Sequence, residues 1–130
     1  MRAILDTSVL IGERPIDGDI EGAVSVVSIT ELHFGVLIAN TDEERARRTA
    51  RLGAVESMFD PLPVTVEVAR SWGQLAAAVH RRGGSPRRRQ IDLAIAATAQ
   101  IEGVPLLTHD LHDFGLIKDL VDVRLIQSAS

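Results

Sequence analysis

Short apolar runs alternate along this chain with longer segments of helical spacing. The apolar runs at 2–5, 23–27, 104–108 and 123–126 predict buried strands, and residues 62–64 can form a further short one. Helical spacing or helix-starting residues predict helices at 6–11, 28–38, for about 15 residues from position 42, at 65–82 and at 85–102. Strands that alternate with helices are typical of an α/β fold, so we expect a mostly parallel central sheet flanked by helices.

Polar residues mark several of the expected helix ends. Ser28 is a candidate N-cap, and Glu31 follows it at the spacing of a capping box. Thr65 is a candidate cap of a later helix, and Gly103 is expected to end the last one. The core-facing stripe of that last helix is predicted to consist of Ile91, Ala94, Ile95, Thr98 and Ile101.

Length and composition indicate an ordinary globular protein. The chain has 130 residues, which predicts one domain over residues 1–130, with 45% hydrophobic and 25% charged residues. It has no cysteine, which excludes disulfides and thiolate metal sites and fits a reducing, cytoplasmic setting. The N-terminus lacks the pattern of a signal peptide, and no apolar run approaches the roughly 18 residues of a membrane span.

The charge pattern is more informative than the net charge of −4, which by itself argues weakly against electrostatic binding of nucleic acid. Of the 14 basic residues only Lys118 is a lysine, and the other 13 are arginines. The arginines cluster at positions 45, 47, 48 and 51 and again at 81, 82, 87, 88 and 89. Because a guanidinium can contact phosphate or carboxylate with two hydrogen bonds, the cluster at 81–89 is a candidate phosphate contact. The cluster at 45–51 can instead bind a partner or form pairs within its helix with Glu43 and Glu44.

Acidic residues recur just after predicted strands. Asp6, Glu31 and Asp110 each follow an apolar run, and Asp92 lies on the helix that leads into the strand before Asp110. The carboxyl ends of parallel strands share one edge of a sheet, where ligands bind. Carboxylates gathered there would repel one another and raise one another's pKa, and a divalent cation would keep them ionised. Oxygen ligands alone favour Mg²⁺ or Mn²⁺ over Zn²⁺.

Each of these acids also has a purely structural interpretation. Asp6 can cap the helix that it precedes, and Glu31 can complete the capping box. Asp92 can lie on an exposed helix face and pair with an arginine one turn earlier. Asp110 and Asp113 lie in a turn, where aspartate is common for local reasons. The same turn contains His109 and His112, so zinc is a further, weaker alternative.

A metal at this edge predicts a particular chemistry. A bound ion can activate water and stabilise the charge that develops on a phosphoryl oxygen, which suits cleavage of phosphodiesters. Thr7, Ser8 and Thr108 are candidates for orienting ligands or contacting phosphate. The sequence leaves open whether one ion or two are bound. The arginines that lead into Asp92 are candidates for binding an RNA backbone, namely Arg87, Arg88 and Arg89.

With these residues placed, the chain resembles the PIN-domain ribonucleases, and most closely the VapC toxins of bacterial type II toxin–antitoxin pairs. The matching segments read ILDTSVLI, SVVSITELHFG, RRRQIDLAIAATA and LLTHDLHDF. They contain Asp6, Glu31, Asp92 and Asp110 in this order and extend from residue 4 to residue 114. The resemblance therefore spans nearly the whole chain.

The resemblance implies a three-layer α/β/α PIN fold and a Mg²⁺- or Mn²⁺-dependent endoribonuclease. Asp6 and Asp92 would be the principal metal ligands, and Glu31 and Asp110 would complete the acidic cluster through water or a second ion. Asp113 would have a supporting role. The implied partners are an RNA substrate, a VapB-type antitoxin that covers the acidic groove, and a second copy of the chain in a homodimer.

Two other function classes remain open at the level of sequence. A non-catalytic module could keep the fold and use the acids to bind a metal or a basic partner. A phosphoacceptor domain also gathers aspartates at strand ends, but it normally needs a pair of acids after the first strand and a late lysine. Here Asp6 stands alone, and Lys118 follows no predicted strand.

Overall fold

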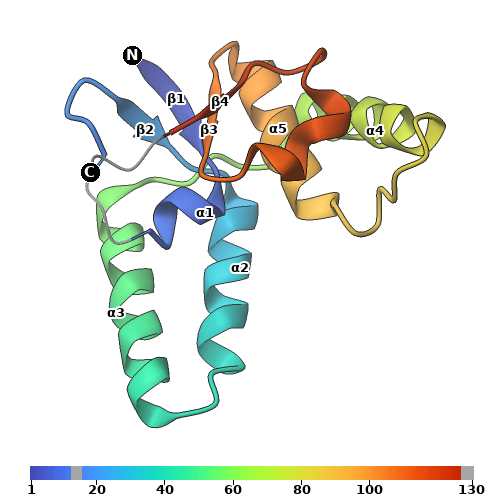
Figure 1. The fold of residues 1–130 in the computed structure, drawn as a ribbon. Coiled ribbons are helices and arrows are strands. Elements are labelled where there is room, and N and C mark those ends of the chain that lie inside the picture. The colour runs from blue at the N-terminus through green and yellow to red at the C-terminus, as the bar shows by residue number, and fades with distance from the viewer. Residues whose placement is uncertain (13–15, 127–130) are drawn as a thin grey trace.

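The central element is a four-stranded parallel sheet. The computed structural model describes residues 1–12 and 16–126, and in this part of the chain every strand pairing is parallel. The order of the strands across the sheet is β2 (Glu21–Ala23), β1 (Arg2–Leu5), β3 (Leu106–Thr108) and β4 (Val123–Leu125). The expected α/β fold with a parallel sheet is therefore confirmed (Figure 1).

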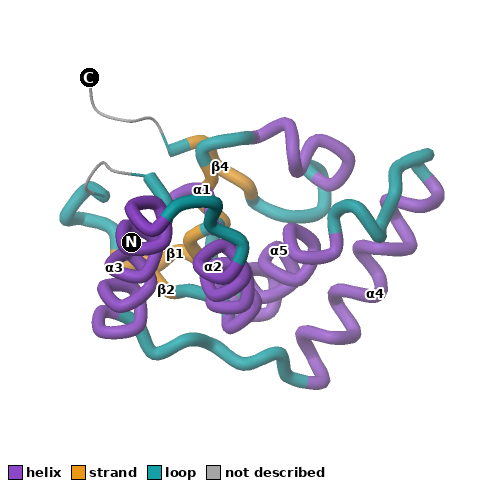
Figure 2. Tube along the Cα trace, turned by 90° about the horizontal axis from the view of Figure 1, so that it is seen from below, coloured by secondary structure: helices purple, strands orange, loops and turns teal. Residues whose placement is uncertain are grey.

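Helices flank the sheet in two groups. The elements of the first group pack against one another, and they are α4 (Val66–Arg81), α5 (Gln90–Glu102) and the 3₁₀ helix η1 (Leu111–Ile117). The second group consists of α1 (Thr7–Leu10), α2 (Val26–Leu37) and α3 (Asp42–Met58). Helices α2 and α3 form a hairpin that extends away from the sheet. Helices α4 and α5 lie beside the sheet, on the side away from α3 (Figures 1 and 2).

The alternation of side chains along β1 divides the core in two. Ile4 is fully buried in the cluster that the residues of α4, α5 and η1 form. Ala3 and Leu5 point to the opposite face, where they pack with Val9 of α1. Because successive strand residues face opposite sides, both faces of the sheet must be covered, and the near-continuous apolar run of β1 reflects this.

The predicted strand at 23–27 is wrong in its boundaries. Strand β2 ends at Ala23, and the valines at 26 and 27 already belong to the first turn of α2. Ser25 is the N-cap, since its side chain accepts a 3.2 Å hydrogen bond from the backbone N–H of Val27. Ser28, the predicted cap, is therefore buried inside the helix, and the capping box with Glu31 does not form.

The last long helix also differs from its prediction. Helix α5 begins at Gln90 rather than at Ser85, because residues 86–89 form a turn. Ile101, assigned to the core stripe, is 45% exposed. The residues from Leu93 to Ala99 are all buried, so α5 is enclosed on nearly all sides over this stretch and has no single apolar stripe.

Other predicted boundaries hold or shift slightly. Thr65 caps α4 by accepting a hydrogen bond from the backbone N–H of Val68, and Gly103 ends α5 with a left-handed φ of +68°. Residues 62–64 form no strand, and only an isolated bridge joins Leu62 to Ser25. Strand β3 begins two residues later than predicted, and β4 ends one residue earlier.

Within residues 1–12 and 16–126, no helix has both the length and the apolar character that a membrane span requires.

The two glycines at positions 103 and 53 allow a paired test of backbone conformation. Gly103→Ala places a Cβ on a residue with φ +68° and should lower the free energy of unfolding by about 1 kcal/mol. Gly53→Ala, at an exposed position inside α3 where a Cβ meets no other atom, should raise it by up to about 1 kcal/mol. Urea denaturation measures both changes, and effects of the same sign would contradict this account.

Candidate active site

Asp6 lies where β1 ends, and it is only 4% exposed. Its Oδ2 atom accepts hydrogen bonds of 2.8 Å from the hydroxyl of Ser8 and 2.8 Å from the hydroxyl of Thr108. The carboxylate makes no capping bond to α1, so the structural interpretation of Asp6 as a side-chain cap is wrong. The recorded hydrogen bonds within the described residues use Oδ2, which leaves Oδ1 for another ligand.

Glu31 faces Asp6 from α2. The hydroxyl of Thr7 donates to Oε1 of Glu31, and it also lies 3.0 Å from the hydroxyl oxygen of the buried Ser28. Burial raises the pKa of Glu31, the hydrogen bond from Thr7 opposes this, and the charge of Asp6 raises the pKa further. Two acids that are 25 positions apart in the sequence therefore act on each other electrostatically.

Asp92 lies in the first turn of α5 and is the most strongly perturbed acid. Burial raises its pKa to about 7, with further increases from the charges of Asp6, Asp113 and Glu31 and an opposing effect of Arg89. Of the three acids that act on it, Asp6 has the largest effect. The structure thus brings Asp6, Glu31 and Asp92 together at the carboxyl edge of the sheet, together with Asp113.

The two acids of the terminal turn have different surroundings. Oδ1 of Asp113 accepts a 2.6 Å hydrogen bond from Nη1 of Arg89, whose Nη1 is also 3.7 Å from Oδ2 of Asp92. Asp110 is exposed and caps η1, accepting a 2.9 Å hydrogen bond from the backbone N–H of His112. Asp110 is not among the charges that shift the pKa of Asp92. The local turn interpretation therefore describes the Asp110 side chain, while Asp113 is the acid that acts on Asp92.

The supporting hydroxyls have clear positions. Thr108, fully buried at the end of β3, donates to Asp6 and accepts a 3.0 Å hydrogen bond from the backbone N–H of Asp110. Ser8 donates to Asp6 and accepts from the backbone N–H of His109 at 3.1 Å. These contacts link the end of β1 to the turn after β3, so that the position of Asp6 depends on both strands.

Some of the arginines form ion pairs with acids, and others are exposed. Arg89 is held by Asp113, whereas Arg87 and Arg88 are exposed and have no ion pair with a described residue. Sequence analysis did not foresee that Arg48 and Arg51 line a hollow of about 250 Å³ with Thr7 and Glu31. Arg48 also donates to the carbonyl oxygen of Gly35 at 2.6 Å and pairs with Glu44. The spacing of Arg48 and Arg51 by three positions signals a shared helix face, but only the α2–α3 hairpin turns that face towards Glu31.

The acids of the cluster offer carboxylate oxygens, which are the ligands that Mg²⁺ and Mn²⁺ prefer. Among the described residues, no three His, Asp or Glu side chains are arranged to hold one ion together. The chemistry nevertheless fits, because the charge of Asp6 raises the pKa of both Glu31 and Asp92, and among the described residues Arg89 is the cation that opposes this effect at Asp92. Mg²⁺ keeps several of its waters and needs only one or two carboxylates, which Asp6 and Asp92 can supply. The zinc alternative gains no support, since Nδ1 of His109 contacts the carbonyl oxygen of Ile126.

Comparison with known proteins supports this description. The sequence matches the PIN domain over residues 3–118. It is 37% identical over 130 residues to the ribonuclease VapC5 of Mycobacterium tuberculosis, which covers 95% of this chain and 93% of VapC5. It is 35% identical over 125 residues to the ribonuclease VapC4 of the same bacterium, covering 92% of this chain and 93% of VapC4. The chain therefore belongs to the PIN-domain family and, within it, to the VapC proteins.

Solved structures agree with this assignment. VapBC-5 from Mycobacterium tuberculosis, a member of the VapBC family of toxin–antitoxin systems, superposes with a TM-score of 0.81 at 36% identity, covering 97% of this chain and 98% of that chain. VapBC2 from Rickettsia felis, bound to a DNA fragment from its promoter, gives a TM-score of 0.77 at 19% identity, covering 98% and 100% of the two chains. The second similarity demonstrates the shared fold alone.

The raised pKa of Asp92 predicts how stability varies with pH. The folded protein holds the Asp92 proton up to pH about 7, against an ordinary pKa of 3.8, so the free energy of unfolding falls as pH rises between these values. Asparagine does not ionise, so the variant Asp92→Asn should not show this loss of stability as pH rises. Without divalent metal, the variant should be more stable than the parent at pH 8, by on the order of 1–2 kcal/mol, and this advantage should fall to about a third of that value at pH 5.

Urea denaturation in EDTA at both pH values measures this difference. The isosteric asparagine keeps the side-chain volume, so packing changes little. A variant that is less stable than the parent at pH 8 would contradict the account of mutual repulsion among the acids.

Proposed function

We propose that this chain is a Mg²⁺- or Mn²⁺-dependent endoribonuclease that acts as the toxin of a type II toxin–antitoxin pair. The observation that carries the proposal is the electrostatic effect of Asp6 on Glu31, and of Asp6 and Glu31 on Asp92, at the carboxyl edge of the sheet. Family membership and the name ribonuclease of the VapC relatives support an RNA substrate. A metal ion held by carboxylates can activate a bound water molecule, which supports cleavage of the phosphodiester by water.

Each residue of the site has a role in this proposal. Asp6 and Asp92 would hold the metal, which when bound lowers the pKa of water and stabilises charge on a phosphoryl oxygen. Ser8 and Thr108 fix the orientation of Asp6 through its Oδ2 atom. Thr7 fixes Glu31 through Oε1, which leaves Oε2 of Glu31 to orient the attacking water or accept its proton.

The remaining candidate residues contribute around this centre. Asp113 adds negative charge and holds Arg89 in place. Asp110 positions the turn after β3, and we retain it as a member of the acidic cluster through water. The exposed Arg87 and Arg88 would contact the RNA backbone, and Arg89 would contact the same RNA nearer to the acids. Arg48 and Arg51 would contact the backbone from the other side of Glu31.

We also propose a VapB-type antitoxin partner and a homodimer. The solved structure of VapBC-5 bears the name of a toxin–antitoxin system. At the end of α2, Phe34, Leu37 and the C-cap residue Ile38 are 60%, 77% and 52% exposed, with spacing that puts them on one side of the helix end. An apolar face of this size, on the helix that carries Glu31, suits a partner that covers the acidic groove.

Substitution of the acids tests the catalytic proposal. Asp6→Asn keeps an oxygen that accepts from Ser8 and Thr108 but removes the charge. We expect Asp6→Asn and Asp92→Asn each to reduce Mn²⁺-dependent RNA cleavage by roughly a factor of 100 or more, since each weakens the metal site. Purified protein, assayed with Mn²⁺ and with EDTA, provides the measurement. Equal cleavage by parent and Asp6→Asn would instead favour a non-catalytic binding module.

The hollow beside Glu31 generates a second test. Arg51→Ala should weaken binding of RNA to the inactive Asp92→Asn protein and should lower the dependence of the binding constant on salt, because one phosphate contact is lost. Arg47→Ala is the matched control, as Arg47 is exposed on the same helix and does not line the hollow. Binding by fluorescence anisotropy at two salt concentrations measures both. Equal losses for the two variants would indicate general charge rather than a contact at this hollow.

A further inference from the structure

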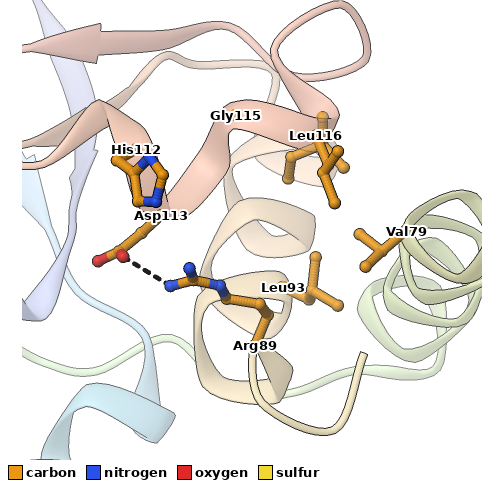
Figure 3. Close-up of a pocket in the computed structure, with 8 residues that line it drawn as sticks. Val79, Arg89, Leu93, His112, Asp113, Gly115 and Leu116 are labelled. Carbon is orange, nitrogen blue, oxygen red and sulfur yellow. Dashed lines mark hydrogen bonds and ion pairs between the residues drawn. The ribbon is translucent and has the colours of Figure 1, made fainter. Parts of the chain in front are cut away.

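A second pocket, of about 260 Å³, lies on the other side of the acidic cluster, between α4, α5 and η1. The side chains that line it include three aliphatic residues and three polar ones (Figure 3): Val79, Leu93, Leu116, Arg89, His112 and Asp113. In the close-up, the aliphatic side chains gather at one side, and Arg89, His112 and Asp113 lie at the other. The pocket therefore has an apolar wall and a polar edge.

Contacts within the protein fix the position of the apolar wall. Arg82 donates to the carbonyl oxygen of Leu116 at 2.6 Å and binds both carboxylate oxygens of Asp119 at 2.7 and 3.0 Å. At Gly84, a Cβ would lie 2.4 Å from Leu116 Cδ1 and 2.8 Å from Val79 Cγ1, so Leu116 packs against bare backbone. These contacts hold Leu116 against α4 without a ligand, which makes the pocket preformed.

The polar edge borders the proposed cleavage site. The guanidinium of Arg89 bonds to Asp113 at 2.6 Å and lies 3.7 Å from Asp92. A ligand at this edge would therefore lie next to the acids that we assign to metal and water. The carboxylate of Asp113 disfavours a phosphate here. A neutral, planar group can instead pack its face on the apolar wall and direct its hydrogen-bond donors and acceptors to the polar edge.

We propose that this pocket binds a guanine base of the RNA, in the nucleotide next to the phosphate that is cleaved. This inference rests on the proposed ribonuclease function and adds a substrate preference to it. The face of a base can pack on Leu93 and Leu116. The N1–H and amino groups of guanine can donate to Asp113, and its O6 and N7 atoms can accept from Arg89. Cytosine and uracil present a smaller face and fewer groups to this edge.

Nucleotide binding in EDTA tests the pocket independently of cleavage. GMP, AMP, CMP and UMP are titrated into methyl-labelled wild-type protein, and the methyl signals of Leu93 and Leu116 are followed by NMR. We expect GMP to shift both signals and to bind roughly tenfold more tightly than AMP, CMP or UMP, since adenine lacks the N1–H and O6 groups. If no mononucleotide shifts these signals, or if GMP shows no preference, the proposal is overturned. Failure of RNA cleavage alone would overturn the ribonuclease proposal and leave this result unaffected.

Two variants and a control assign the binding to this pocket. Leu116→Trp fills the pocket and should reduce GMP affinity at least about tenfold, and His112→Ala tests the polar edge without altering a buried residue. Leu120→Trp is the control, since Leu120 is 39% exposed nearby and does not line the pocket. Unchanged affinity in both pocket variants would overturn the proposal. It would also be overturned if an antitoxin peptide shifted the pocket signals while the nucleotides did not.

The same variants connect the pocket to cleavage. RNAs that differ only at the nucleotides flanking the cut are compared by kcat/KM. Wild-type protein should favour guanine at one flanking position, and Leu116→Trp should abolish that preference while Leu120→Trp retains it. Equal cleavage of all four substitutions at every flanking position would contradict the assignment.

Discussion

The repulsion among carboxylates at one edge of the sheet is the constraint on which the candidate site depends. Asp6 is buried at the end of β1, where a charge is costly unless hydrogen bonds or a cation stabilise it. Two hydroxyls bind one of its oxygens, yet its charge still raises the pKa of both Glu31 and Asp92. The fold thus concentrates negative charge that its own side chains offset only in part.

The parallel register is what makes this concentration possible. Leu5 pairs with Leu107, and the backbone N–H of Asp6 donates to the carbonyl oxygen of Leu107 at 2.9 Å. The next residue of each strand is then Asp6 or Thr108, so the carboxylate and the hydroxyl meet. From the same turn, Ser8 binds Asp6 while Thr7 binds Glu31. Three consecutive residues therefore join β1, α2 and the turn after β3.

Periodicity and residue type predicted most of this arrangement. They failed where the same residues suit two local structures equally well. The run around Val24 and Val27 suits a strand, and both Ser25 and Ser28 suit a cap. In the structure Ser25 forms an isolated parallel bridge with Leu62 and caps α2, a pairing that the local pattern does not contain. Likewise, Asp110 and Asp113 share one turn, and spacing does not reveal which one faces Asp92. The position of Arg51 required the packing of α3 on α2, which no local pattern encodes.

The shift of Asp92 has a consequence for any cation that the site binds. A carboxyl group whose pKa is about 7 is protonated in half of the molecules near neutral pH. A metal ion binds the ionised form and must displace that proton, so its apparent affinity increases as pH rises towards 7 and beyond.

Arg89, which lowers the pKa of Asp92, favours loss of the proton and also competes with the metal for the same negative charge. The pairing of Arg89 with Asp113 moderates this competition, because the guanidinium is held at 2.6 Å from Asp113 and at 3.7 Å from Asp92. Arg89 thus keeps Asp92 and Asp113 close together while leaving Asp92 open to a stronger cation.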